Sequence, residues 1–124
     1  YRAFAYLEDE LPQAFAAADL AVARAGAAVL GELPAMALPA ILAPLPIAGQ
    51  HQLPNAAYLA ERGAAHIVAD ASLATDLLPA IHSLLFDPAR LAAMAAASAA
   101  LAQPDAADRI AQAILDLAAH PSPL

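Results

Sequence analysis

Four residues of the types that hold a sugar or a phosphate stand near the ends of two short apolar segments. Gly26 and Glu32 follow the segment 19–24, and Gln52 and Asn55 follow the segment 39–44. In an open parallel sheet, ligands bind beyond the carboxyl ends of the strands, where loops lead into helix N-termini. We therefore expect these residues to meet at one edge of a sheet and to form a ligand site there.

The turn around Gly26 has the form of an anion site. We expect the first free N–H groups of the following helix to belong to Ala27, Ala28 and Val29, and Gly26 to let a ligand approach this backbone closely. The attraction of such a helix end for an exposed charge is only about 0.3–1 kcal/mol. Because the chain has a net charge of -7, a diphosphate would need further donors from elsewhere.

Each polar side chain also has a structural interpretation. Glu32 can accept hydrogen bonds from the two hydroxyls of a ribose, or it can be a solvated helix residue. Gln52 and Asn55, three residues apart at a helix start, can hydrogen-bond sugar hydroxyls or can simply cap the helix. Arg24 could meet a phosphate, or it could hold the loop through backbone carbonyls or an acidic neighbour.

The elements that must position these residues follow from apolar periodicity and punctuation. Helices are expected at about residues 11–18, 27–37 and 54–62, and Gly63 suits the end of the third. Between them the sequence predicts four parallel strands: FAYL (4–7), DLAVAR (19–24), PAILAP (39–44) and AHIVAD (65–70). The fold class is therefore α/β.

After Asp70 the pattern predicts helices only. One runs from Ser72 to about residue 86 with a kink or a break at Pro79, a second restarts at Asp87–Pro88, and a third begins at Pro104–Asp105. We expect one domain over residues 1–124, with a β/α part at 1–70 and C-terminal helices at 71–124.

Composition excludes several classes of function. The chain has no cysteine, only five Lys and Arg, and no uninterrupted apolar run near the ~20 residues of a membrane span. We therefore expect no disulfide, no nucleic-acid partner and no transmembrane helix. The four histidines do not stand at metal-ligand spacing, so we expect no metal and no cofactor. The start at Tyr1 favours a piece of a longer protein.

The order of motifs resembles the C-terminal half of the MurG family of GT-B glycosyltransferases. The resemblance covers nearly the whole chain and rests on ADLAVARAGA, GE, LPAILAPLP, GQHQLPNA, LAERGAA and PDAADRIAQAI. That family transfers N-acetylglucosamine from UDP-N-acetylglucosamine to the lipid-linked precursor lipid I in peptidoglycan synthesis. It is built as two facing Rossmann-like domains. The resemblance thus implies a parallel Rossmann-like sheet with flanking helices, followed by an all-helical stretch.

The resemblance also implies roles for single residues. Glu32 matches the residue that binds the ribose, Gln52 the one that holds N-acetylglucosamine, and Leu7 the one whose backbone contacts uracil. Asn55 and His51 would lie beside Gln52. The segment expected near the phosphates and the sugar comprises Gly26, Ala27, Ala28, Val29, Leu30 and Gly31.

The chain departs from the family pattern at three positions. Ala25 stands where serine is common, Ala37 stands where glycine often precedes Leu-Pro, and Pro34 lies inside the helix after Glu32. The family's amino-terminal domain and its GGS-type loop are absent from the sequence. We therefore expect a donor-binding part that is not catalytically competent alone, with lipid I bound through the missing domain.

These implications leave alternatives open. The chain could belong to another UDP-sugar transferase of the same superfamily, to a naturally separate donor-binding subunit with a membrane-anchored partner, or to a scaffold without a ligand. The expected location is the cytoplasm, with the full-length enzyme peripheral on the inner face of the cell membrane. A truncated sheet would also expose an unpaired edge, so we expect self-association.

Overall fold

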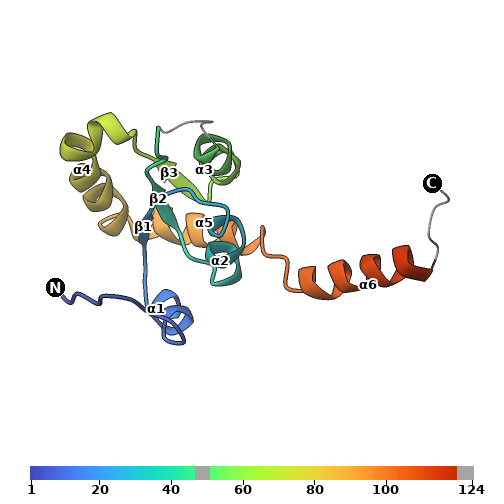
Figure 1. The fold of residues 1–124 in the computed structure, drawn as a ribbon. Helices are drawn as coiled ribbons and strands as arrows, with labels where there is room; N and C mark the ends of the chain where they lie inside the picture. Colours follow the sequence, from blue (N-terminus) through green and yellow to red (C-terminus); the bar gives the residue numbers. More distant parts are fainter. Residues whose placement is uncertain (47–50, 120–124) are drawn as a thin grey trace.

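The structure, a computed structural model, is organised around a three-stranded parallel sheet (Figure 1). It describes residues 1–46 and 51–119, so Gly49 and Gln50 of the GQHQLPNA motif and His120 lie outside the described residues. The strands, in the spatial order β1-β2-β3, are β1 (Ala21–Ala23), β2 (Ala40–Leu42) and β3 (Ala65–Ile67). β2 is the central strand and pairs in parallel with β1 on one side and with β3 on the other; Ala40 lies opposite Ala21 and Ala65. The predicted α/β class is confirmed.

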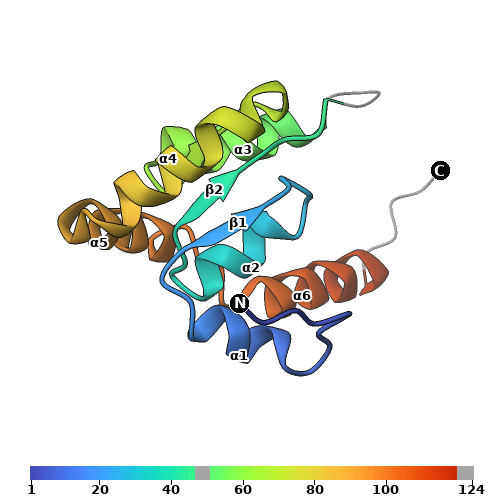
Figure 2. The same cartoon turned by 90° about the vertical axis from the view of Figure 1, so that its left-hand side faces the viewer.

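Helices cover the sheet on both faces, which explains why β2 is entirely apolar. Ala40 and Leu42 belong to a core cluster with residues of α2 (Val29–Ala35) and α3 (Gln52–Glu61). Ile41 instead packs in a second cluster with residues of α4 (Leu73–Leu85) and α5 (Pro88–Ala99). Figure 1 shows α4 on one side of the sheet and α2 and α3 on the other; in Figure 2, turned by 90°, α4 passes in front of α3. Because α2 and α3 pack in one cluster, both helices and their N-termini lie on the same face of the sheet.

The predicted strand at 4–7 is wrong. These residues form no strand, and Phe4 and Tyr6 are 65% and 79% exposed. Apolar content alone does not make a strand, because a strand also needs a neighbour to complete its hydrogen-bond ladder. No described residue pairs with this segment. It leads into α1 (Leu11–Ala16), whose Phe15 packs against the first core cluster.

The helices after β3 follow the predicted order. A short 3-10 helix, η1 (Asp70–Ser72), precedes α4, which runs through Pro79 without the expected break. Thr75 and Pro79 are both exposed, so water can hydrate the Thr75 carbonyl that lacks its helical N–H partner. Asp87 caps α5 as predicted, since its side chain accepts a hydrogen bond from the Arg90 N–H at 3.0 Å.

The last helix, α6 (Ala106–Ala119), extends away from the helices that cover the sheet (Figure 1). None of its described residues is buried, although Ile110, Ile114 and Leu117 lie at helical spacing along one side. This all-helical stretch completes the predicted fold class.

The helix α2 ends in a left-handed turn that uses alanine. Ala37 has φ 51°, the region that favours glycine. Its N–H donates to the carbonyl of Pro34 at 3.0 Å, and the N–H of Leu38 donates to that of Leu33 at 2.9 Å. This pair of hydrogen bonds is the Schellman motif. The helix therefore ends with the same geometry that a glycine would give, at a higher conformational cost.

The helix α3 ends in the same motif with glycine, as predicted for Gly63. Its φ is 78°, and its N–H donates to the carbonyl of Ala60 at 2.9 Å. The N–H of Ala64 donates to the carbonyl of Leu59, also at 2.9 Å. Both crossover helices thus return the chain to the sheet through one type of turn.

Candidate functional site

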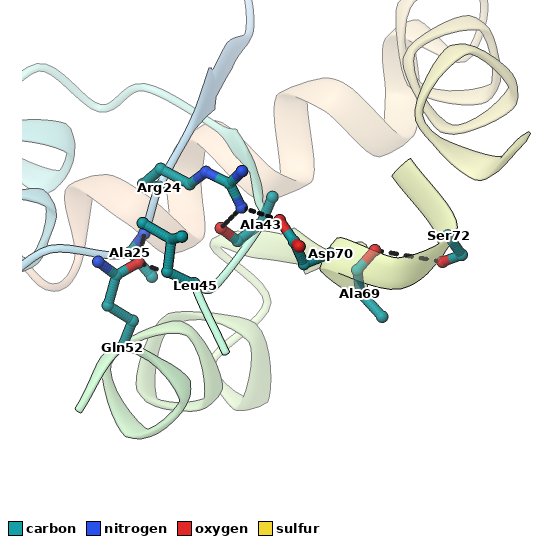
Figure 3. Close-up of polar contacts among 8 residues, drawn as sticks. All are labelled: Arg24, Ala25, Ala43, Leu45, Gln52, Ala69, Asp70 and Ser72. Atoms are coloured by element: carbon teal, nitrogen blue, oxygen red, sulfur yellow. Dashed lines mark hydrogen bonds and ion pairs between the residues drawn. The ribbon is translucent and has the colours of Figure 1, made fainter. Parts of the chain in front are cut away.

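The loop after β1 is held by the first turn of α3. Gln52 Oε1 accepts hydrogen bonds from the N–H of Ala25 at 3.1 Å and from the N–H of Leu45 at 3.0 Å (Figure 3). Asn55 Nδ2 donates to the carbonyl of Ala25 at 3.0 Å. Both backbone groups of the buried Ala25 are therefore fixed by α3 side chains.

The local sequence explains this arrangement. Gln52 is the first residue of α3, and Asn55 is three residues further, so both side chains lie on one face of the helix. The carboxyl ends of β1 and β2 are neighbours, which brings the loop after β1 beneath this face. The expectation that Gln52 and the loop of Gly26 meet at one edge of the sheet is confirmed. Neither amide caps its own helix; they bind the neighbouring loop.

The amides keep part of their hydrogen-bonding capacity. An amide offers one carbonyl oxygen and two N–H donors. Within the described residues, Gln52 Nε2 has no acceptor and Asn55 Oδ1 has no donor. Both side chains are half-buried rather than enclosed. A bound ligand could therefore receive a hydrogen bond from Gln52 and donate one to Asn55.

The N-terminus of α2 presents free backbone donors, shifted one residue from the expected set. The N–H of Val29 donates to the carbonyl of Gly26 at 3.3 Å, and that of Leu30 donates to the carbonyl of Ala27 at 3.1 Å. In the described part of the chain, the N–H groups of Gly26, Ala27 and Ala28 have no acceptor. Val29 was expected to be free and is not, because the chain already turns at Gly26. A Cβ on Gly26 would meet no atom within 4 Å, so the backbone is open to a ligand.

Glu32 lies on the exposed side of α2. Its side chain has no hydrogen-bond or ion-pair partner among the residues with described positions. The N–H of Gly31, one residue earlier, donates to the carbonyl of Ala28 at 3.1 Å and is not available to a ligand. Glu32 borders a hollow of about 180 Å³ between α1 and α2, whose other lining residues are Leu11, Pro12, Phe15, Ala35 and Met36.

Leu7 and His51 stand apart from this arrangement. Leu7 lines a hollow of about 420 Å³ with residues of the N-terminal segment and of α1. That hollow shares no lining residue with the one beside Glu32. His51 occupies the N-cap position of α3, is exposed, and makes no capping hydrogen bond. Leu7 and Glu32 thus line separate hollows, and His51 lies next to Gln52 at the start of α3.

Arg24 has the structural role that the sequence left open. Its Nη1 donates to the carbonyl of Ala43 at 3.1 Å and to Asp70 Oδ1 (Figure 3). Asp70 was not singled out from the sequence, because the two residues are 46 positions apart. The only signal was that each is the last residue of a predicted strand of one sheet, 19–24 and 65–70.

The sequence also gave no sign of an apolar hollow of about 290 Å³ at the same edge of the sheet. Its lining residues come from the end of β3, from the segments after β2 and β3, and from α3: Pro44, Leu45, Pro46, Leu53, Ile67, Ala69, Asp70 and Ala71. No described group of three His, Cys, Asp or Glu side chains could hold a metal ion. Among the described helices, none is long and apolar enough to cross a membrane.

Residues 1–110 match the family model of the glycosyltransferase family 28 C-terminal domain. The chain belongs to this family. The match spans the β1 loop, the N-terminal turns of α2 and α3, and the Arg24–Asp70 pair. The fold is thus that of a family 28 C-terminal domain.

Curated relatives and a solved structure agree with this assignment. The N-acetylglucosamine transferase of Mycolicibacterium paratuberculosis, named for UDP-N-acetylglucosamine and N-acetylmuramyl-(pentapeptide) pyrophosphoryl-undecaprenol, is 46% identical over 94% of this chain and 29% of its own length. The protein of the same name from Roseiflexus is 54% identical over 79% of this chain and 23% of its own. The crystal structure of Acinetobacter baumannii MurG matches with a TM-score of 0.79 and 33% identity, over 90% of this chain and 32% of that chain. This family 28 chain thus spans less than a third of these relatives.

Proposed function

We propose that this chain binds the donor UDP-N-acetylglucosamine for a transferase that glycosylates lipid I in peptidoglycan synthesis. The relatives are named for this donor and for a pyrophosphoryl-undecaprenol acceptor. The observation that carries the proposal is the fixed loop at Ala25. The amide groups of Gln52 and Asn55 hold it, and the free N–H groups of Gly26, Ala27 and Ala28 follow it directly.

Each group at the site has a separate role in this proposal. Gln52 Oε1 is occupied by two backbone N–H groups, so Gln52 would contact the sugar as a donor through Nε2. Glu32 would accept hydrogen bonds from the ribose hydroxyls. The open N–H groups at Gly26 to Ala28 would face the diphosphate, which suits the partial positive charge of a helix N-terminus. Leu7 would contact uracil through its backbone.

The remaining functions belong to the part of the relatives that this chain does not cover. We place lipid I binding and the catalytic base there, because the chain aligns with less than a third of those proteins. A polyprenyl-linked acceptor requires reaction at a membrane surface. We therefore propose a peripheral enzyme at the cytoplasmic face of the membrane.

The test separates the ribose contact from the sugar contact in the protein at its full natural length. Glu32→Ala should weaken UDP and UDP-N-acetylglucosamine alike by about ten- to a hundredfold, because hydrogen bonds to a charged group are worth about 1.5–3 kcal/mol. Calorimetric titration of both ligands gives the affinities. The matched control is Glu61→Ala, an exposed glutamate at the other end of α3, which should bind both ligands like the parent.

The variant Gln52→Glu tests the sugar contact without releasing the loop. A glutamate keeps an oxygen for the N–H groups of Ala25 and Leu45 and removes the amide donor. It should lower the affinity for UDP-N-acetylglucosamine relative to UDP by about two- to tenfold, the value of one neutral hydrogen bond. An unchanged ratio of the two affinities would show that Gln52 does not contact the sugar. Failure of the parent protein to bind either ligand would refute the proposed function.

A further inference from the structure

We propose that Arg24 and Asp70 form a positioning pair that fixes the donor-binding loop without contacting the donor. The inference rests on the proposed donor function and concerns how its loop is held. The Arg24 guanidinium contacts Asp70 Oδ1 and the carbonyl of Ala43 through the same nitrogen, Nη1. Figure 3 shows this side chain reaching from the end of β1 toward both partners.

The pair ties together the segments that follow all three strands. Arg24 comes directly after β1, Ala43 directly after β2, and Asp70 opens η1 shortly after β3. The N–H of Ala43 also donates to the carbonyl of Ala23 at 2.9 Å. At the carboxyl ends of the strands, backbone hydrogen bonds join neighbouring segments, and the Arg24 side chain links the segments that follow all three strands.

The position of Arg24 in the loop gives this pair its effect on the ligand site. The next peptide, at Ala25, is fixed by Gln52 and Asn55, and the peptide after it carries the first free N–H, at Gly26. The loop is therefore held by two independent anchors on consecutive residues. Loss of the Asp70 anchor would leave the Arg24 side chain held by the Ala43 carbonyl alone, so that the loop and the free N–H groups after it would be less firmly oriented.

Because the Arg24–Asp70 pair is partly exposed, its effect on ligand binding can be told apart from its effect on folding stability. The side chains of Arg24 and Asp70 are 44% and 33% exposed, and exposed ion pairs contribute little to stability. Breaking the pair should therefore change ligand binding much more than the melting temperature. A purely structural salt bridge would show the opposite pattern.

Because Asp70 is negatively charged, its removal distinguishes a positioning role from simple charge repulsion of the donor. A carboxylate near a diphosphate repels it, so removal of the charge alone would tighten donor binding. If Asp70 instead holds Arg24 in place, its removal should weaken binding. The two explanations predict changes of opposite sign for one substitution, Asp70→Ala.

The experiment measures UDP and UDP-N-acetylglucosamine binding by calorimetry, with steady-state kinetics, on the protein at its full natural length. Asp70→Ala should weaken both ligands by about three- to thirtyfold, as for coupled neighbouring side chains. The KM for the donor should rise, while kcat and the KM for the acceptor stay unchanged. The control Asp19→Ala removes the same charge from an exposed residue before β1, at the opposite edge of the sheet, and should leave binding unchanged.

Two more variants complete the test. Arg24→Gln/Asp70→Ala should bind no worse than Arg24→Gln alone, because each change breaks the same contact. Asp70→Asn, the milder change, should lie between the parent and Asp70→Ala, and it serves as the reporter if Asp70→Ala does not fold.

The outcomes separate this inference from the proposed function. Unchanged or tighter binding by Asp70→Ala, with weaker binding by Arg24→Gln, would show that Arg24 contacts the diphosphate directly and would overturn the positioning role. A lower melting temperature with unchanged binding would overturn it as well. If the parent protein bound neither UDP nor UDP-N-acetylglucosamine, the proposed donor function would be refuted, and the positioning role would be refuted with it.

Discussion

Replacement of Ala37 by glycine should stabilise this protein. Ala37 ends α2 in the left-handed region, with φ 51°, and a left-handed conformation costs an L-residue about 1–2 kcal/mol. Glycine removes this cost but adds freedom to the unfolded chain, which offsets about 0.4–1 kcal/mol. The net gain in unfolding free energy is thus about 1 kcal/mol. For a domain of this size the melting temperature should rise by about 3–5 °C.

The second Schellman motif supplies a matched control of opposite sign. Gly63→Ala places a Cβ at 3.7 Å from the Cβ of Ala97, an ordinary van der Waals contact. The change therefore reports the backbone penalty alone, and it should lower the unfolding free energy by about 1 kcal/mol. The double variant Ala37→Gly/Gly63→Ala should melt close to the parent, because the two turns are separate sites.

The assay is thermal and urea unfolding followed by circular dichroism. The reasoning is refuted if Ala37→Gly leaves the midpoint unchanged or lowers it while Gly63→Ala destabilises as expected. That result would mean that the chain at position 37 gains nothing from glycine, so that the end of α2 is not strained.

Three further predictions concern other parts of the chain. Ser98→Ala should lower the unfolding free energy by about 0.5–1.5 kcal/mol, because its buried Oγ donates to the carbonyl of Leu38 at 3.2 Å; an unchanged urea midpoint would contradict this. The hydroxyl of Thr75 donates to the Asp76 carboxylate and holds the pKa of that carboxyl below its ordinary value. The stability that this hydrogen bond contributes is therefore fully present above the pKa of Asp76 in the unfolded chain. It is lost as the pH falls through the lower pKa of Asp76 in the folded protein. In a titration followed by NMR, Thr75→Val should raise the Asp76 pKa, and no change would exclude the contact. The chain of 124 residues should self-associate through the free edge of β1, where Val22 is 47% exposed, and Val22→Lys should reduce this in sedimentation; a parent that stays monomeric at high concentration would count against it.

The sequence predicted the parts of the fold that local chemistry determines. The three segments that became β1, β2 and β3 were recognised as short apolar runs, the pattern expected of strands covered by helices. Of the three, β2 alone is buried along its whole length, and Val22 of β1 is 47% exposed. Gly63 and Asp87 marked helix ends because few residues suit a left-handed turn or an N-cap. The segment at 4–7 has the same apolar character and still forms no strand, since pairing depends on a neighbour and not on local composition.

The candidate site was predicted in position but not in its contacts. Gly26 and Gln52 were placed at one edge because parallel strands end together. That Gln52 Oε1 binds the N–H groups of Ala25 and Leu45 could not be foreseen, because it depends on the exact orientation of α3 over the sheet. The same holds for Arg24, whose partner is set by tertiary structure alone.

The strand order β1-β2-β3 has a consequence for the sequence of events in folding. β2 pairs with β1, and β3 pairs with β2, so these three strands can pair in the order of synthesis, without waiting for a distant segment to be inserted between them. The contacts that fix the loop after β1 arrive in the same order. Gln52 is synthesised at the start of α3, whereas Asp70 is synthesised only after β3. Ribosome-bound intermediates that end before Asp70 would therefore hold this loop through Gln52, Asn55 and the Arg24–Ala43 hydrogen bond, without the Asp70 contact.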